Sequence, residues 1–206
     1  MTYLLRRLLI VSTLCLFGTA VQAQDITSPE EFFGFKMGAD RKLANWDRLV
    51  EYYQLVGAES DRMKVVDMGD TEMGQPFLAL YISTPKNLAR LDEIKAYNDK
   101  LVDPRGIAMS EIDEAVENSV AIVVQSFGIH SNEVAAPQTA AETVYDLLTR
   151  DDEDMTRILN ETLSIFIPAF NPDGQKMVVD WYNSNVGTEY ETSPLPWLYH
   201  KYIGHD

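Results

Sequence analysis

A histidine and a glutamate stand three residues apart in the segment Ser126-Phe127-Gly128-Ile129-His130-Ser131-Asn132-Glu133. The segment follows an apolar run that is typical of a strand and precedes a predicted helix, a junction where α/β proteins gather functional residues. In a turn or a first helical turn, this spacing puts both side chains on one side. Imidazole nitrogen and carboxylate oxygen both bind zinc. His130 and Glu133 are therefore candidate metal ligands, although a pair that merely caps the helix would leave the same pattern.

A second segment, Asn171-Pro172-Asp173-Gly174, follows the next predicted strand along the chain. These residue types favour a turn, and a structural turn explains them without any chemistry, with Asp173 as part of it. If the two strands are parallel, the turn lies at the same edge of the sheet as His130.

The middle of the chain is predicted to contain a strand, two helices and a second strand, in that order. The apolar run 120–124 predicts a strand that is buried on both faces. The further predictions are a helix over 135–149, a helix near 154–161 and a strand over 163–169. This order predicts an α/β domain with a mixed β-sheet flanked by helices. The acidic run Asp151–Asp154 fits a solvated helix start better than a metal site.

The preceding part of the chain predicts helices around a hairpin. Ser28 and Pro29 are typical of a helix start. Apolar residues at helical spacing predict a helix over 40–56 that stops at Gly57. The remaining predictions are hairpin strands over 64–68 and 77–82, a helix near 87–99 and a helix that starts at Ser110.

The composition limits the classes of function. The 206 residues are 46% hydrophobic and carry a formal net charge of −15. This length suits one domain with a hydrophobic core. Because a strongly negative surface repels phosphate groups, nucleic acids are excluded as partners, and so is an anionic membrane surface.

Residues 1–23 have the pattern of a secretory signal peptide, with an uncleaved anchor as the alternative. Arg6 and Arg7 precede an apolar run over 8–18, and Val21-Gln22-Ala23 offers small residues for cleavage. Removal of this segment lowers the charge to −17, because it holds two arginines and no acid. It also removes Cys15, the single cysteine, so residues 24–206 cannot form a disulfide. We expect a secreted or periplasmic protein that has no membrane segment after cleavage.

The chain resembles the zinc carboxypeptidases of the carboxypeptidase A type, the M14 peptidases. The resemblance is carried by Gly128-Ile129-His130-Ser131-Asn132-Glu133, by Asn171-Pro172-Asp173-Gly174, and by the hairpin with Gly69, Gly74 and Pro76. It implies a zinc-exopeptidase-like fold over residues 24–206, zinc as cofactor, and His130 and Glu133 as two of the zinc ligands. It also implies a peptide or peptidoglycan-stem substrate that is cut at its C-terminus.

The resemblance covers only the first part of the family's catalytic machinery. The family's later ligand histidine, its catalytic glutamate and the Asn-Arg pair that binds the substrate carboxylate have no counterpart before Asp206. We therefore expect a C-terminally incomplete and inactive catalytic domain, with its catalytic base unknown. His205, and less favourably His200, are the alternatives for a third ligand within this chain.

Two other functions stay open. Zinc amidohydrolases that act on N-acyl amino acids share a similar His-x-x-Glu start, and an exported binding domain could keep the scaffold without catalysis. The aromatic residues from Trp181 onward predict a long ordered loop. They either line a substrate cleft or pin this loop to the domain, and the second interpretation is favoured.

Overall fold

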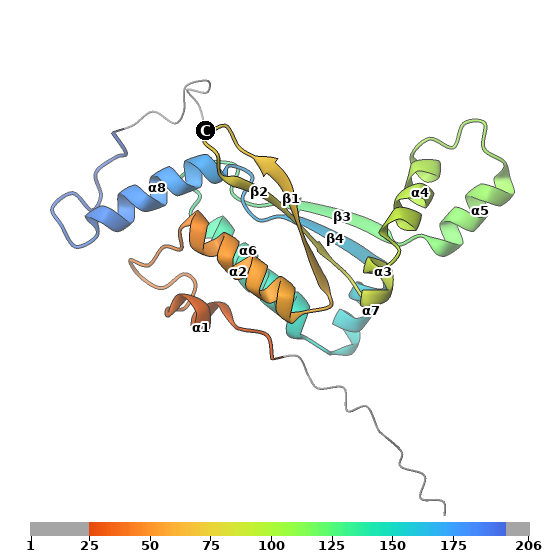
Figure 1. Cartoon of the computed structure of the whole chain (residues 1–206), viewed down its shortest axis with the longest axis horizontal. Coiled ribbons are helices and arrows are strands. Elements are labelled where there is room, and N and C mark those ends of the chain that lie inside the picture. Colours follow the sequence, from red (N-terminus) through yellow and green to blue (C-terminus); the bar gives the residue numbers. More distant parts are fainter. Residues whose placement is uncertain (1–24, 197–206) are drawn as a thin grey trace, which may run out of the picture.

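A computed structural model describes residues 25–196 of the chain. Four strands form one mixed sheet in the order β1-β2-β4-β3, and the described helices flank it (Figure 1). The elements are α1 (Pro29–Phe33), α2 (Trp46–Glu59), β1 (Met63–Asp70), β2 (Pro76–Ile82), α3 (Pro85–Leu88), α4 (Leu91–Val102), α5 (Met109–Asn118), β3 (Ala121–Ser126), α6 (Ala135–Thr149), α7 (Glu153–Glu161), β4 (Thr162–Ile167) and α8 (Pro172–Asn185). The predicted mixed sheet flanked by helices is confirmed.

The strand pairing fixes which loops can meet. β1 and β2 form the predicted antiparallel hairpin, and β2 pairs antiparallel with β4. β3 and β4 are parallel, with Ala121 opposite Thr162 and Ser126 opposite Ile167. Because parallel strands end at the same edge, the segments after β3 and β4 leave the sheet side by side.

The hydrophobic core lies between the sheet and the helices α2 and α6. Trp46, Leu49, Leu80 and Val144 are fully buried, and Phe166 of β4 packs with them. The predicted end of α2 at Gly57 is wrong, because the helix continues to Glu59. Gly57 is instead a point of close approach, where an added Cβ would lie 2.8 Å from Cγ2 of Val65 on β1.

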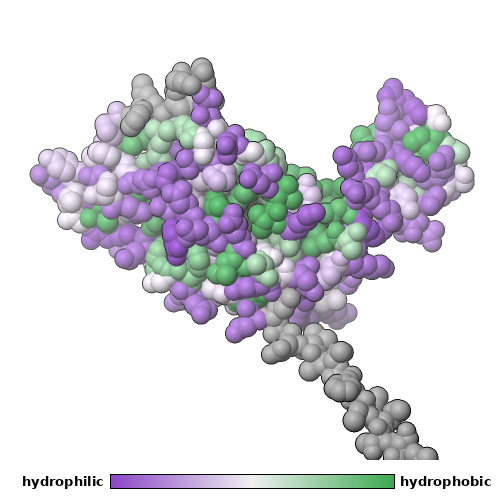
Figure 2. Space-filling view, viewed as in Figure 1, coloured by the Kyte–Doolittle hydropathy of each residue, from purple (hydrophilic) through white to green (hydrophobic). Residues whose placement is uncertain are grey.

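The prediction that the run 120–124 is buried on both faces is wrong. β3 lies at the edge of the sheet, and Val123 and Val124 are 45% and 66% exposed. On the face away from α2 and α6, Ile122, Leu163 and Ile165 line an open groove of about 730 Å³. Figure 2 shows hydrophobic surface near the middle of the view, where Figure 1 places the strands.

The helices α4 and α5 form a hairpin that projects from the sheet at one end of the molecule (Figure 1). They pack mainly against each other, and Val102, Met109 and Val116 are exposed on them. The predicted start at Ser110 is one residue late: α5 begins at Met109, after Ala108 at the N-cap position.

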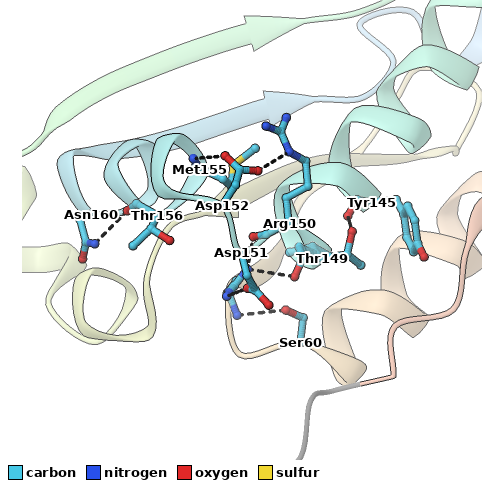
Figure 3. A network of polar contacts seen from close by, with 11 residues as sticks. Ser60, Tyr145, Thr149, Arg150, Asp151, Asp152, Met155, Thr156 and Asn160 are labelled. Carbon is cyan, nitrogen blue, oxygen red and sulfur yellow. Dashed lines mark hydrogen bonds and ion pairs between the residues drawn. The ribbon is translucent and has the colours of Figure 1, made fainter.

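The acidic run before α7 is a solvated helix start, as predicted (Figure 3). Asp152 is the N-cap of α7, and its carboxylate accepts a hydrogen bond from the backbone N–H of Met155 at 3.1 Å. Arg150 pairs with Asp152 at 2.8 Å, and Arg62 pairs with Asp151 at 2.7 Å. The neighbouring guanidinium holds the pKa of Asp152 below its usual range.

Several predictions lie outside residues 25–196, namely the signal peptide, His200 and His205. Within residues 25–196, none of the helices combines the length and the apolar character needed to cross a bilayer.

The contact of Gly57 with Val65 leads to a test by a double-mutant cycle. Alanine normally stabilises a helix interior by about 1 kcal/mol relative to glycine. In the otherwise unchanged chain, we expect Gly57→Ala to lose this gain, because its Cβ meets a stiff β-branched side chain. In a Val65→Ala background, we expect Gly57→Ala to stabilise by about 1 kcal/mol. Urea unfolding followed by circular dichroism measures both effects, and equal effects in the two backgrounds would contradict the prediction.

Candidate metal centre

The loops that follow β3 and β4 are joined by backbone hydrogen bonds. The N–H of Phe170 donates to the carbonyl of Phe127 at 2.7 Å, and the N–H of Asn171 donates to that of Gly128 at 3.1 Å. The two loops therefore continue the parallel pairing of their strands. The expectation that the 171–174 segment lies at the same edge as His130 is confirmed.

Two glycines allow these loops to pack closely. Gly128 has φ +58°, and an added Cβ would lie 3.1 Å from Cγ of Pro137 at the start of α6. Gly174 lies against the other loop, since a Cβ there would come within 2.6 Å of Cβ of Ser131. A side chain at either position would push the His130 loop away from its present place.

His130 and Glu133 lie in one tight turn just before α6. The backbone N–H of His130 donates to Oε2 of Glu133 at 3.2 Å, and the N–H of Glu133 donates to the carbonyl of His130 at 3.1 Å. His130 is half-buried and Glu133 is exposed. Sequence spacing therefore predicted correctly that the two residues share a turn. The carboxylate of Glu133 is oriented by the backbone of its own loop.

The donor atoms of this pair suit zinc, but the pair supplies at most two ligands. Imidazole nitrogen and carboxylate oxygen belong to the usual ligand set of catalytic zinc, which takes three protein ligands. Within residues 25–196, no group of three or more His, Cys, Asp or Glu side chains could hold a metal ion. The proposed third ligands His205 and His200 lie outside this range.

The Asn171–Gly174 segment begins a helix, so the predicted turn is wrong. Asn171 is the N-cap of α8, and its side chain accepts a hydrogen bond from the N–H of Gly174 at 2.9 Å. Asp173 is buried and accepts hydrogen bonds from the Thr71 hydroxyl and from the N–H of Met73. Asp173 therefore ties the start of α8 to the β1–β2 loop, and its carboxylate is occupied by structural contacts.

Two buried glutamines fix the chain that leads into α2, a contact that sequence reasoning missed. Gln138 of α6 accepts a hydrogen bond from the N–H of Ala44 at 3.1 Å. Gln175 of α8 donates to the carbonyl of Ala44 at 2.9 Å. Both glutamines are at most 4% exposed. A polar residue within each helix was the only signal in the sequence, and it does not indicate a partner.

A pocket of about 540 Å³ opens beside the candidate metal loop. Ser131 and Asn132, which separate His130 from Glu133, form one side of it. Trp181 and Tyr182 form another side, and both lie on α8, so the predicted loop from Trp181 onward begins only after Asn185. Trp181 also pins that loop, because its Nε1 donates to the carbonyl of Ser193 at 3.1 Å.

Glu191 anchors the loop that forms the far wall of this pocket. Its carboxylate receives two hydrogen bonds from the guanidinium of Arg41, one of them at 2.8 Å from Nε. It also accepts hydrogen bonds from the Tyr182 hydroxyl at 3.3 Å and from the N–H of Gly187 at 2.9 Å. These contacts lower the pKa of Glu191 to about 2. The hydrogen bonds from Arg41 have the largest effect, and the one from the N–H of Gly187 has the next largest.

The geometry at Gly128 predicts an effect on stability beyond backbone strain. We expect Gly128→Ala to destabilise the chain more than Gly106→Ala, by about 1 kcal/mol, because the new methyl group also meets Pro137. Gly106 is the matched control: its φ is +78°, and nothing lies within 4 Å of an added Cβ. Urea unfolding measures both variants. Equal losses of stability would show that the Pro137 contact does not constrain the loop.

The lowered pKa of Glu191 predicts how stability changes in acid. The folded pKa of about 2 lies below the ordinary glutamate value of about 4.3, so the ionised form is the one that stabilises the fold. Its contribution is complete above the ordinary pKa and is lost as the pH falls through about 2. We expect Glu191→Gln to be less stable than the parent at pH 6, and the difference to shrink toward pH 2. Urea midpoints at several pH values test this, and a difference that does not depend on pH would contradict it.

Comparisons with known proteins place the chain in a family. The sequence profile of Peptidase_M14, zinc carboxypeptidase, matches residues 49–191, more than two thirds of the chain. None of the curated proteins matches it. Among solved structures, thrombin activatable fibrinolysis inhibitor is 12% identical with a TM-score of 0.48 and covers 72% of this chain and 28% of its own. The bovine form of that inhibitor, in complex with tick carboxypeptidase inhibitor, is 12% identical with a TM-score of 0.41 and covers 68% and 34%.

A carboxypeptidase A from Helicoverpa armigera is 16% identical with a TM-score of 0.47 and covers 79% of this chain and 33% of its own. The chain thus spans about a third of the length of these structures. Their low identities and scores carry no argument of their own, so the assignment depends on the sequence profile. On that match, the chain belongs to the M14 family of zinc carboxypeptidases.

Proposed function

We propose that the chain supplies two zinc ligands, His130 and Glu133, to the active site of a secreted metallocarboxypeptidase. The observation that carries the proposal is the single turn that holds both residues at the carboxyl end of the parallel β3–β4 pair. The membership in the zinc carboxypeptidase family supports it. The pattern of residues 1–23 supports export, to the periplasm or to the outside of the cell.

The residues of this chain would hold and orient the reacting groups. Bound zinc would supply a Lewis acid and lower the pKa of a bound water molecule toward neutrality. The N–H of His130 fixes the carboxylate of Glu133, which limits the positions that its oxygens can take. Asn171 and Asp173 hold the neighbouring loop in place from the start of α8. These contacts keep the two ligand residues at a constant place on the sheet edge.

Two further catalytic roles, the base that activates water and the cation that binds the substrate carboxylate, are not assigned to the acids and the arginine discussed next. Asp173 is engaged by Thr71 and Met73, so it is not the candidate for the base that takes a proton from water. Asp151 pairs with Arg62, just before β1, and the start of β1 lies level with the start of β4. Asp151 and its neighbour Asp152 therefore lie at the opposite end of the sheet from the His130 loop. Arg41 is bound to Glu191 and does not offer a free guanidinium for a substrate carboxylate. We propose peptides or peptidoglycan stems as substrates of the whole enzyme, cut at the C-terminus.

The presence of only two candidate ligands among residues 25–196 favours a second candidate, a non-catalytic exported binding domain. In that case, replacement of His130 should leave binding of the partner unchanged, whereas a metal site would lose zinc. An amidohydrolase that acts on N-acyl amino acids is distinguished by its substrate, since it would cleave an acyl amino acid and not a peptide.

Zinc titration of the purified chain tests the ligand assignment. We expect weak zinc binding, because two ligands are fewer than catalytic zinc requires. We expect His130→Ala and Glu133→Gln each to lower the affinity at least about tenfold. Calorimetry with zinc and absorption spectra with cobalt measure this. Glu153→Gln is the matched control, because Glu153 is an exposed acid in the first turn of α7, away from the His130 loop, and it should leave the affinity unchanged.

Two further experiments test whether His200 or His205 is a zinc ligand and whether the chain cleaves a peptide. We expect His205→Ala and His200→Ala to leave the zinc affinity unchanged, and we expect no turnover on a peptide with a free C-terminus or on its amidated form. An unchanged affinity in both His130→Ala and Glu133→Gln would disprove the ligand assignment. Turnover of the free peptide would disprove the expectation that essential catalytic groups are missing from this chain.

A further inference from the structure

The pocket beside the His130 loop has apolar walls from two different parts of the chain. Val178, Trp181 and Tyr182 come from one face of α8, whereas Pro194 and Leu195 come from the segment after it. Asn132, next to Glu133, closes the side toward the candidate metal loop. Its volume of about 540 Å³ is sufficient for one large side chain, and small-molecule sites have a similar size.

The donor groups of Trp181, Tyr182 and Ser193 in these walls are already engaged in hydrogen bonds. The indole N–H of Trp181 donates to the carbonyl of Ser193, and the Ser193 hydroxyl donates to that of Tyr190 at 2.6 Å. The Tyr182 hydroxyl donates to Glu191. Since these donors are engaged within the wall, the pocket presents mainly ring faces and aliphatic groups to an occupant.

The charge in the pocket is neutralised by a residue outside its lining. Glu191 is the one charged side chain among the described lining residues, and Arg41 forms two hydrogen bonds with its carboxylate. A basic side chain that entered the pocket would meet a carboxylate already paired with a guanidinium. It would lose its hydration without gaining a free partner.

We propose that this pocket binds an apolar or aromatic side chain of the peptide substrate, and that Arg41 sets this preference by masking Glu191. The proposal rests on the proposed function for the identity of the substrate as a peptide. The chemistry of the pocket does not depend on zinc, because its walls contain neither His130 nor Glu133. The bound side chain of the substrate would lie next to the loop that holds His130 and Glu133. A pocket at this place can select the substrate by a residue near the cleaved bond.

Binding of capped amino acids with zinc removed by a chelator tests the pocket separately from the metal site. The probes are N-acetyl-phenylalaninamide and N-acetyl-lysinamide, which have no free carboxylate. Nuclear magnetic resonance of ¹⁵N-labelled indole groups follows Trp181, whose signal is assigned with Trp181→Phe. We expect a saturable shift with the phenylalanine probe and at least about tenfold weaker binding of the lysine probe.

Three variants make the test specific. Val178→Gln puts a polar group into the pocket and should weaken the phenylalanine probe at least about tenfold, and Leu195→Gln repeats this test from the other wall. Val116→Gln is the matched control, since Val116 is exposed on α5, outside the pocket lining, and should change nothing. Arg41→Gln frees the carboxylate of Glu191, so the preference for phenylalanine over lysine should fall about tenfold.

Each result bears on one part of the proposal. No saturable shift of Trp181, equal binding of the two probes, or full binding in both Val178→Gln and Leu195→Gln would overturn the pocket assignment. An unchanged preference in Arg41→Gln would overturn the role of Arg41. If the pocket binds the phenylalanine probe but the chain fails the zinc test, the proposed function fails, and the pocket remains a site for apolar side chains.

Discussion

The parallel pairing of β3 with β4 is the constraint on which the candidate centre depends. It sends both following loops off the same edge of the sheet, and two backbone hydrogen bonds then hold these loops together beyond the strands. His130 and Glu133 follow from the first loop, and α8 begins from the second. If the strands were antiparallel, these groups would lie at opposite ends of the sheet, and no change of side chain could bring them together.

Around this pairing, single residues fix segments that are far apart in the sequence. Asp173 holds the β1–β2 loop, while Gln138 and Gln175 hold the backbone of Ala44 between α6 and α8. Arg41 then reaches Glu191 from the same N-terminal stretch. Three separate sets of buried or paired polar contacts therefore hold the segments around the metal loop and the pocket in place. Such contacts favour one arrangement of the loops because an unpaired buried group is costly.

Local sequence patterns were sufficient to predict most helices and strands, but not which parts of the chain pack against them. The helix over 135–149 and the turn that joins His130 to Glu133 were predicted correctly, because both depend on neighbouring residues. The burial of β3 was predicted wrongly, since an apolar run cannot show whether a strand has neighbours on both sides.

Gly57 and Asp173 show the same limit for single residues. A glycine near the end of an apolar pattern suggests a helix stop, but here it makes room for Val65 on β1. Asp173 fits a turn by composition, yet its partners are about a hundred residues away. Partners at this distance cannot be inferred from spacing, because they depend on how the sheet is assembled. The pairing of Arg41 with Glu191, which neutralises the pocket, was not foreseen for this reason.

The edge position of β3 has a consequence for handling the protein in solution. Val124 is 66% exposed, and among residues 25–196 the strand is bonded in the sheet only to β4. A strand edge with free backbone groups and apolar side chains is a template for addition of another strand. The net charge of −15 opposes contact between copies, but salt screens this repulsion. Addition of a strand to the backbone of Ala121–Ser126 would therefore be favoured by high protein concentration and high ionic strength.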